Sequence, residues 1–494
     1  MKKILLILIS LFMCAGLFAG GRKDAVKVNE LKSYTSMEMD MVSYGNTVYE
    51  AVLAMNHTDL GKGTPIYINK FVNNKYDSTF QIDVEGFKNY EFDEHYSHYD
   101  FLKLYAIGPN EIILTVYSAF SDNRFAFIRI KDGKITAYKS YSLKNQRAYE
   151  SQRYAFNGKD RIYVAFNGQT DFKETGWDLY LMSFDLDGNL KNAVSVYTKK
   201  NDELLGLAAA GDKVYFGIGL NYEKKSVLQL SKDLEYEKCL GCKYSGSDIM
   251  YINLESFTQT NVEGANGPDA DGTLLVKCSM ENQGNGHNIS YALRFSGDGK
   301  FVCSYMTDES YSDDSFNFCK PMVSDEGILY FGHRTRYEPD SFKHAEVNCI
   351  SYFMDWDGNK LYEKMYGNCK DYDFKQFANI DDKYFCSGEN FYEADGIGHV
   401  AYTYLIDGET QDSNHVEMKK TDFNPIACPT DPDAADAYDS EFKYWEKNVR
   451  VEPIEIPKWD FGCRLKKIRL NFMHLDPLSK EITDSLPLFP FSER

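Results

Sequence analysis

Amide and imidazole side chains recur at one place in a repeating pattern, at or near the end of the second strand of several repeats. Amides from several repeats would hydrogen-bond a polyhydroxylated or peptide ligand, and imidazoles that converge from different loops would bind a metal ion. Asparagine is also a common turn residue that ends strands, and this simpler interpretation is favoured. We predict no metal site. The candidate ligand-binding residues are Asn56, His57, Asn167, Asn221, Asn282, His287, Arg334, Asn390 and His399.

Two short segments, Asp185–Asn189 and Asp355–Asn359, share the pattern Asp-x-Asp-Gly-Asn and resemble fragments of calcium-binding loops. Both lack the distant bidentate glutamate that completes an EF-hand loop. Their position in the repeat already explains them as hairpin turns, so we predict no cofactor and keep calcium as the less favoured alternative.

Cys239 and Cys242 form a single Cys-x-x-Cys motif. A four-thiolate zinc site would need a second such pair, which the sequence lacks. Lys243 follows where covalent haem attachment needs histidine. The motif therefore predicts a structural disulfide or two plain thiols.

No catalytic signature is present. The chain has no Gly-x-Ser-x-Gly or His-Glu-x-x-His motif, and its many carboxylates do not single out an acid–base pair. The formal net charge of −19, without a long Lys/Arg run, argues against a nucleic-acid partner. The catalytic residues of any activity are unknown at this level.

The elements that must position these residues are seven similar units. Each unit reads as four strands, a to d, and ends in a two-strand hairpin whose polar turn often contains Asp-Gly. Strands are predicted, for example, over Glu111–Tyr117, Asp178–Phe184 and Lys213–Leu220. The c–d turns are minimal, whereas the b–c loops are long and polar, as in His333–Val347. The c–d turns begin at Asn73, Asp132, Asp187, Lys232, Asp298, Asp357 and Asp407.

A four-stranded unit of this size cannot bury its own apolar face, so the units must stack on one another. The pattern resembles that of β-propeller proteins over residues 24–420, without the signatures of the WD40, sialidase or quinoprotein types. The resemblance implies an all-β fold, a β-propeller of seven four-stranded blades. It also implies that the b–c loops share one face, where we expect the binding surface.

The two ends of the 494-residue chain differ from the repeats. Residues 1–19 have the charged, apolar and small-residue regions of a signal peptide, which predicts export to the periplasm, cell surface or medium. Lipid anchoring at Cys14 is a less favoured alternative. Residues 421–494 are predicted to be a short mixed C-terminal extension with a linker, a short helix and strands. We expect no transmembrane segment.

Two functions fit these observations. The favoured one is an exported, monomeric binding or scaffold protein whose b–c loops hold a protein, peptide or glycan partner. The alternative is a secreted propeller enzyme of the hydrolase or lyase type, with an active site at the mouth of the channel. Fold alone does not separate them, because propellers host both.

Overall fold

The computed structural model describes residues 26–468 with gaps, and every statement below concerns the residues it describes. The longest stretches outside the description are 1–25, 55–65, 85–100, 169–177, 258–273, 423–449 and 469–494. The predicted signal peptide, Cys14 and the predicted helix of the extension lie in these stretches.

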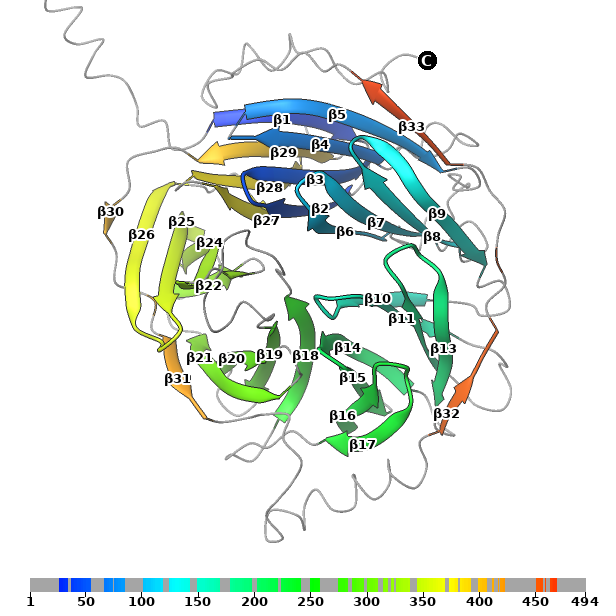
Figure 1. The fold of residues 1–494 in the computed structure, drawn as a ribbon. Coiled ribbons are helices and arrows are strands. Elements are labelled where there is room, and N and C mark those ends of the chain that lie inside the picture. Colours follow the sequence, from blue (N-terminus) through cyan, green and yellow to red (C-terminus); the bar gives the residue numbers. More distant parts are fainter. Residues whose placement is uncertain are drawn as a thin grey trace, which may run out of the picture.

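The described chain forms β-strands arranged in a ring of six hydrogen-bonded sheets (Figure 1). In each four-stranded unit, the strand named first below lies nearest the centre of the ring, and the strand named last lies at its outer edge (Figure 1). The first sheet holds β2 (Met37–Tyr44), β3 (Thr47–Ala54), β4 (Ile66–Val72) and β5 (Lys75–Val84). The second holds β6 (Phe101–Gly108), β7 (Glu111–Ser118), β8 (Arg124–Lys131) and β9 (Lys134–Ser142). The third holds β10 (Tyr149–Phe156), β11 (Ile162–Gly168), β12 (Asp178–Phe184) and β13 (Leu190–Tyr197).

The fourth sheet is the largest. It holds β14 (Asp202–Ala210), β15 (Lys213–Leu220), β16 (Lys224–Ser231), β17 (Tyr236–Leu240), β18 (Ile249–Phe257), β19 (Leu274–Asn282), β20 (His287–Phe295) and β21 (Phe301–Glu309). The fifth holds β22 (Asp314–Phe318), β23 (Met322–Val323), β24 (Gly327–Tyr337), β25 (His344–Asp355) and β26 (Lys360–Asn368). The sixth holds β27 (Asp373–Ile380), β28 (Lys383–Phe391), β29 (His399–Ile406) and β1 (Val26–Ser33).

The all-β propeller fold is confirmed, but the predicted seven separate blades are six sheets. The difference lies in the fourth sheet, which joins two predicted units, β14–β17 and β18–β21. Their first strands pair in parallel through Gly206 with Leu254 and Leu207 with Glu255. This backbone pairing joins two different units. The sequence repeat describes only the strands within one unit, so it does not predict the pairing.

Both ends of the described chain complete sheets that the middle began. β1 pairs antiparallel with β29 and forms the outer strand of the last sheet. The C-terminal strands β30 (Gln411–Asp412), β31 (Met418–Thr421), β32 (Arg450–Pro453) and β33 (Cys463–Ile468) pair antiparallel with β26, β21, β13 and β5. Lys458 also forms a bridge with Tyr141 of β9. We call β30–β33 the belt, since it follows the outer edge of the ring in the reverse order of the sheets (Figure 1).

The core consists of apolar layers between neighbouring sheets, which we call seams. One seam joins β6–β9 to β10–β13 and contains Phe125, Phe127, Tyr141 and Phe184, all fully buried. The ring of Phe184 stacks on Phe125 with centroids 5.0 Å apart and lies 5.3 Å from Tyr141. Strands with large apolar residues on both faces, such as β12 with all seven residues buried, follow from this two-sided packing.

Nothing helical in the described part of the chain has the length and apolarity that a bilayer crossing requires.

Candidate functional site

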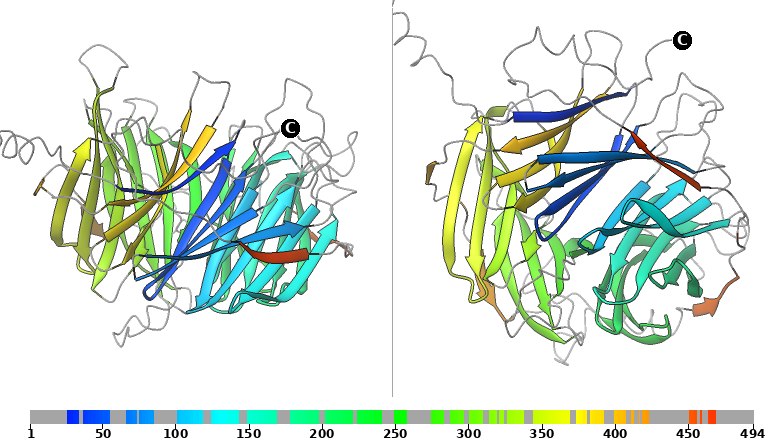
Figure 2. Two further views of the ribbon diagram at one scale, coloured as in Figure 1. Left: turned by 90° about the horizontal axis from the view of Figure 1, so that it is seen from above. Right: turned by 45° about the horizontal axis from the view of Figure 1, so that its top comes forward.

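The strands run between two different sides of the ring (Figure 2). Since the strands within each unit are antiparallel, the a–b and c–d connections share one side, which we call the turn side. The b–c and d–a connections share the other, the loop side. The connections 55–65, 85–100, 169–177 and 392–398 belong to the loop side, whereas 258–273 is a long connection on the turn side. The predicted contrast was between short c–d turns and long b–c loops, and two of the predicted b–c loops are short as well. Only residues 221–223 separate β15 from β16, and only 283–286 separate β19 from β20.

Six of the nine predicted ligand-binding residues lie in strands rather than in the connecting loops. Strand pairing continues further toward the loop side than the polar sequence suggests; β24 and β25, for example, pair out to Tyr337 and His344. Asn56, His57 and Asn221 lie outside the described residues. The six strand residues are Asn167, Asn282, His287, Arg334, Asn390 and His399.

Most of these six residues still mark the loop-side ends of their strands. Asn282 pairs with His287 across β19 and β20. His399 pairs with Phe391 across β28 and β29, next to Asn390. They are therefore on the loop side of the ring, and the six residues are spread over four sheets.

Asn167 has a structural contact. Its Oδ1 accepts a 3.0 Å hydrogen bond from the backbone N–H of Leu204, in the first strand of the next sheet. Asp40 makes the same kind of contact, since its Oδ2 accepts a 2.8 Å bond from the N–H of Leu104. These side chains satisfy inner-strand backbone groups of a neighbouring sheet.

Arg334 lies in the interior of β24, opposite Phe316 and Asn348, and is only 9% exposed. The polar run around it led us to predict a loop over His333–Val347. Residues 338–343 alone separate the two strands.

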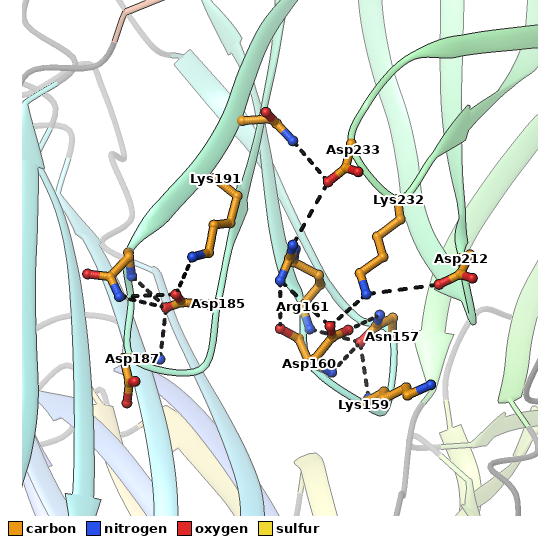
Figure 3. A network of polar contacts seen from close by, with 12 residues as sticks. Asn157, Lys159, Asp160, Arg161, Asp185, Asp187, Lys191, Asp212, Lys232 and Asp233 are labelled. Atoms are coloured by element: carbon orange, nitrogen blue, oxygen red, sulfur yellow. Dashed lines mark hydrogen bonds and ion pairs between the residues drawn. The ribbon is translucent and has the colours of Figure 1, made fainter.

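The turn side is tied from sheet to sheet by charged side chains. Arg129 of β8 contacts Asp187 in the β12–β13 turn at 2.5 Å. Arg161 lies 3.9 Å from Asp233 in the β16–β17 turn, and Lys232 contacts Asp160 at 2.6 Å. Figure 3 shows the last two contacts side by side. Each tie links a strand or turn of one sheet to a turn of its neighbour.

Tyrosine hydroxyls reinforce these ties. Tyr141 donates to the carbonyl of Gly188 at 2.7 Å, and Tyr305 donates to that of Trp356 at 2.8 Å. Arg294 also lies over the ring of Trp356, 4.2 Å from its centroid. Sequence reasoning missed this system, although one signal was present: Arg129 and Arg294 occupy matching positions in the c strand, shortly before the turn.

The Asp-x-Asp-Gly-Asn segments form turns, as predicted. Asp185 accepts hydrogen bonds from the backbone N–H groups of Asp187 and Asn189 and contacts Lys191 at 2.7 Å (Figure 3). Asp355 accepts the equivalent bonds from Asp357 and Asn359. The carboxylates that would ligate calcium thus hold their own turns.

Asp185 gives the turn side a measurable pH dependence. Burial alone would raise its pKa, but hydrogen bonds from Lys191 and Asn189 outweigh burial and lower the pKa below the ordinary 3.8. Its contribution to stability is therefore fully present above pH 3.8 and is lost as the pH falls through the lowered value. In chemical denaturation, Asp185→Asn should unfold at lower denaturant than wild type at pH 6, with the gap narrowing below pH 3.8. Asp212→Asn, at a 75% exposed position, is the control. A gap that does not change with pH would contradict this role.

No group of three or more His, Cys, Asp or Glu side chains gathers within the described residues in a way that could hold a metal ion. Cys239 is buried in β17, and no two of the described cysteines form a disulfide. Cys242 lies outside the description, so the predicted Cys239–Cys242 disulfide stays a prediction.

A cleft of about 450 Å³ opens at the turn side, between the first and second sheets. Its floor is apolar and includes Ile112 and Ile130, and its rim carries Lys70, Asp77 and Asp132. Lys70 donates to Asn110 at 3.0 Å and so bridges the two walls. Leu465 and Lys467 of the belt complete the outer wall. This hollow lies on the side opposite to the predicted binding surface.

No known family model matches the chain, and no curated protein resembles it significantly. Among solved structures, it is similar to the WD40 domain of SCAP from fission yeast, with TM-score 0.37 and 7% identity over 77% of this chain and 98% of that one. It is also similar to the polysaccharide lyase Uly1, with TM-score 0.33 and 9% identity over 74% and 89% of the two chains. A GH43 glycoside hydrolase matches with TM-score 0.25 and 10% identity over 80% and 97%. Similarity this distant carries no information about activity.

Proposed function

We propose that the protein is a binding scaffold that holds a protein, peptide or glycan ligand on the loop side of its ring. The supporting observation is the set of contacts between sheets on the turn side. On the turn side, side chains such as Arg129, Asp160 and Lys232 are engaged in ties between sheets. A rigid framework of this kind suits loops that carry recognition residues at its other side.

The proposal includes export, because the first 19 residues have the pattern of a signal peptide. The protein then acts as a monomer outside the cytoplasm. A hydrolase or lyase remains the alternative function. An enzyme would change its ligand chemically, whereas a scaffold would leave it unchanged.

The strand register offers a clean way to remove loops. Gly168 pairs with Asp178, Ser118 with Arg124, and Phe391 with His399. Because the residues of each pair face one another across a hairpin, an Asn-Gly turn can replace 169–177, 119–123 or 392–398 without displacing the strands. Asp212→Ala, on the turn side, is the matched control.

The full mature chain should bind a ligand on a glycan or peptide array without altering it. At least one of the three shortened variants should bind that ligand at least tenfold more weakly, whereas Asp212→Ala binds as wild type does. Wild-type affinity in all three shortened variants would contradict the loop-side assignment. If mass spectrometry detects shortened products of the ligand, the result would support the enzymatic alternative and contradict the scaffold function.

A further inference from the structure

The belt does more than lengthen four sheets. Each of its longer strands pairs with the outermost strand of a sheet, whose free N–H and C=O groups would otherwise be open to pairing with another chain. β33 pairs with β5 over six residue pairs, from Cys463 with Val84 to Ile468 with Thr79. β31 and β32 pair with β21 and β13 in the same antiparallel manner.

The belt also places apolar side chains in the seams. Leu465 packs against the core between the first and second sheets. Val451 packs between the third sheet and the β14–β17 part of the fourth, and Ile454 between the second and third. Met418, 7% exposed, belongs to the core between β20–β21 and β24–β25. Every one of these contacts touches a layer shared by two neighbouring sheets or units.

Polar contacts of the belt span seams in the same way. Lys420 lies in β31, on the edge of β21, yet it contacts Asp357 in the β25–β26 turn at 3.0 Å. The N–H of Val416 donates to the buried Glu363 of β26 at 3.1 Å, while Met418 pairs with Thr307 of β21. Val416 and the strand Met418–Thr421 therefore contact both the fourth and the fifth sheet.

We propose that the outer rim of the ring is a strand-docking surface whose ligand is the chain's own C-terminal belt, and that the docked belt clamps neighbouring sheets together. Backbone pairing supplies affinity, and one apolar anchor for each seam supplies position, as in strand addition to a sheet edge. The inference is independent of the ligand on the loop side.

The test compares a seam anchor with its neighbour in β33. Leu465→Asp places a charge in the seam, whereas Lys466→Ala changes an exposed residue of the same strand. Hydrogen–deuterium exchange of the full chain should become at least tenfold faster in Leu465→Asp at Thr79–Val84 of β5. The same should hold across the seam at Ile128–Ile130 of β8, and Lys466→Ala should exchange as wild type does.

Docking is tested separately by adding a synthetic peptide of residues 460–470 in excess to Leu465→Asp. The peptide should restore slow exchange at β5. Faster exchange confined to β33, or a peptide that restores nothing, would overturn the proposal. If Leu465→Asp does not fold, Leu465→Ala gives the same comparison with a smaller change, and equal exchange in Leu465→Ala and Lys466→Ala would overturn it.

Discussion

Replacing Phe184 with alanine is expected to destabilise the protein by about 3–5 kcal/mol, the usual cost of deleting a fully buried aromatic side chain. Phe184 is 0% exposed and contacts Phe125, Phe127 and Tyr141 of the neighbouring sheet. The cavity would open within a seam, where two separate sheets must both move to fill it. The measurement is the midpoint of urea unfolding, followed by tyrosine fluorescence and far-UV circular dichroism.

Val302→Ala is the control for this prediction, because Val302 is 47% exposed in β21. Its effect should stay within about 0.5 kcal/mol. Equal midpoints for the two variants would mean that the seam between β6–β9 and β10–β13 does not hold the ring together.

The second large effect is expected at a turn. Gly188 has φ +76°, and a Cβ there would overlap the ring of Phe127 in the next sheet. Gly188→Ala should therefore cost about 1–2 kcal/mol for the left-handed backbone. Displacing Phe127 should add about 1–3 kcal/mol through overpacking. Urea unfolding measures the combined loss.

Gly133→Ala separates the two contributions. Gly133 has a similar φ of +69°, but its Cβ would lie 3.0 Å from the edge of the partly exposed Phe80 ring. This variant should lose mainly the backbone contribution. If Gly188→Ala is no worse than Gly133→Ala, the close contact between turn and neighbouring sheet is not a source of stability.

Local features of the fold could be predicted from the sequence because their causes are local. The strands Asp178–Phe184 and Lys213–Leu220 have the predicted bounds, since runs of apolar and aromatic residues favour buried strands. The turn at Asp132–Gly133 follows from the positive φ that both of its residues adopt.

Features that depend on partners far away in the chain could not be predicted. The parallel pairing of Leu207 with Glu255 turned two predicted blades into one sheet. The extension was expected to contain strands, but their partners in β13 and β5 are set by the path around the ring. The spacing of strands along the sequence does not predict which sheet each of these strands joins.

The candidate site shows the same division. The loop-side position of residues such as His287 and His399 follows from strand order alone. Whether a polar residue lies in a loop or in a strand depends on how far its neighbour continues the hydrogen-bonded ladder, which is why Arg334 was misplaced. Asn167 was predicted as a ligand-binding residue, but its Oδ1 accepts a hydrogen bond from the N–H of Leu204 in another sheet. The sequence does not predict that contact.

The central claim, that ligands bind on the loop side, is tested most directly by hydrogen–deuterium exchange of the full chain with and without the tightest-binding array ligand. The account predicts slower exchange in the ligand-bound protein at loop-side strand ends, such as Asn167–Gly168 and His399, with no change at the turn Asp185–Asn189. Protection confined to the turns, or to the cleft around Asp132 and Lys467, would contradict it.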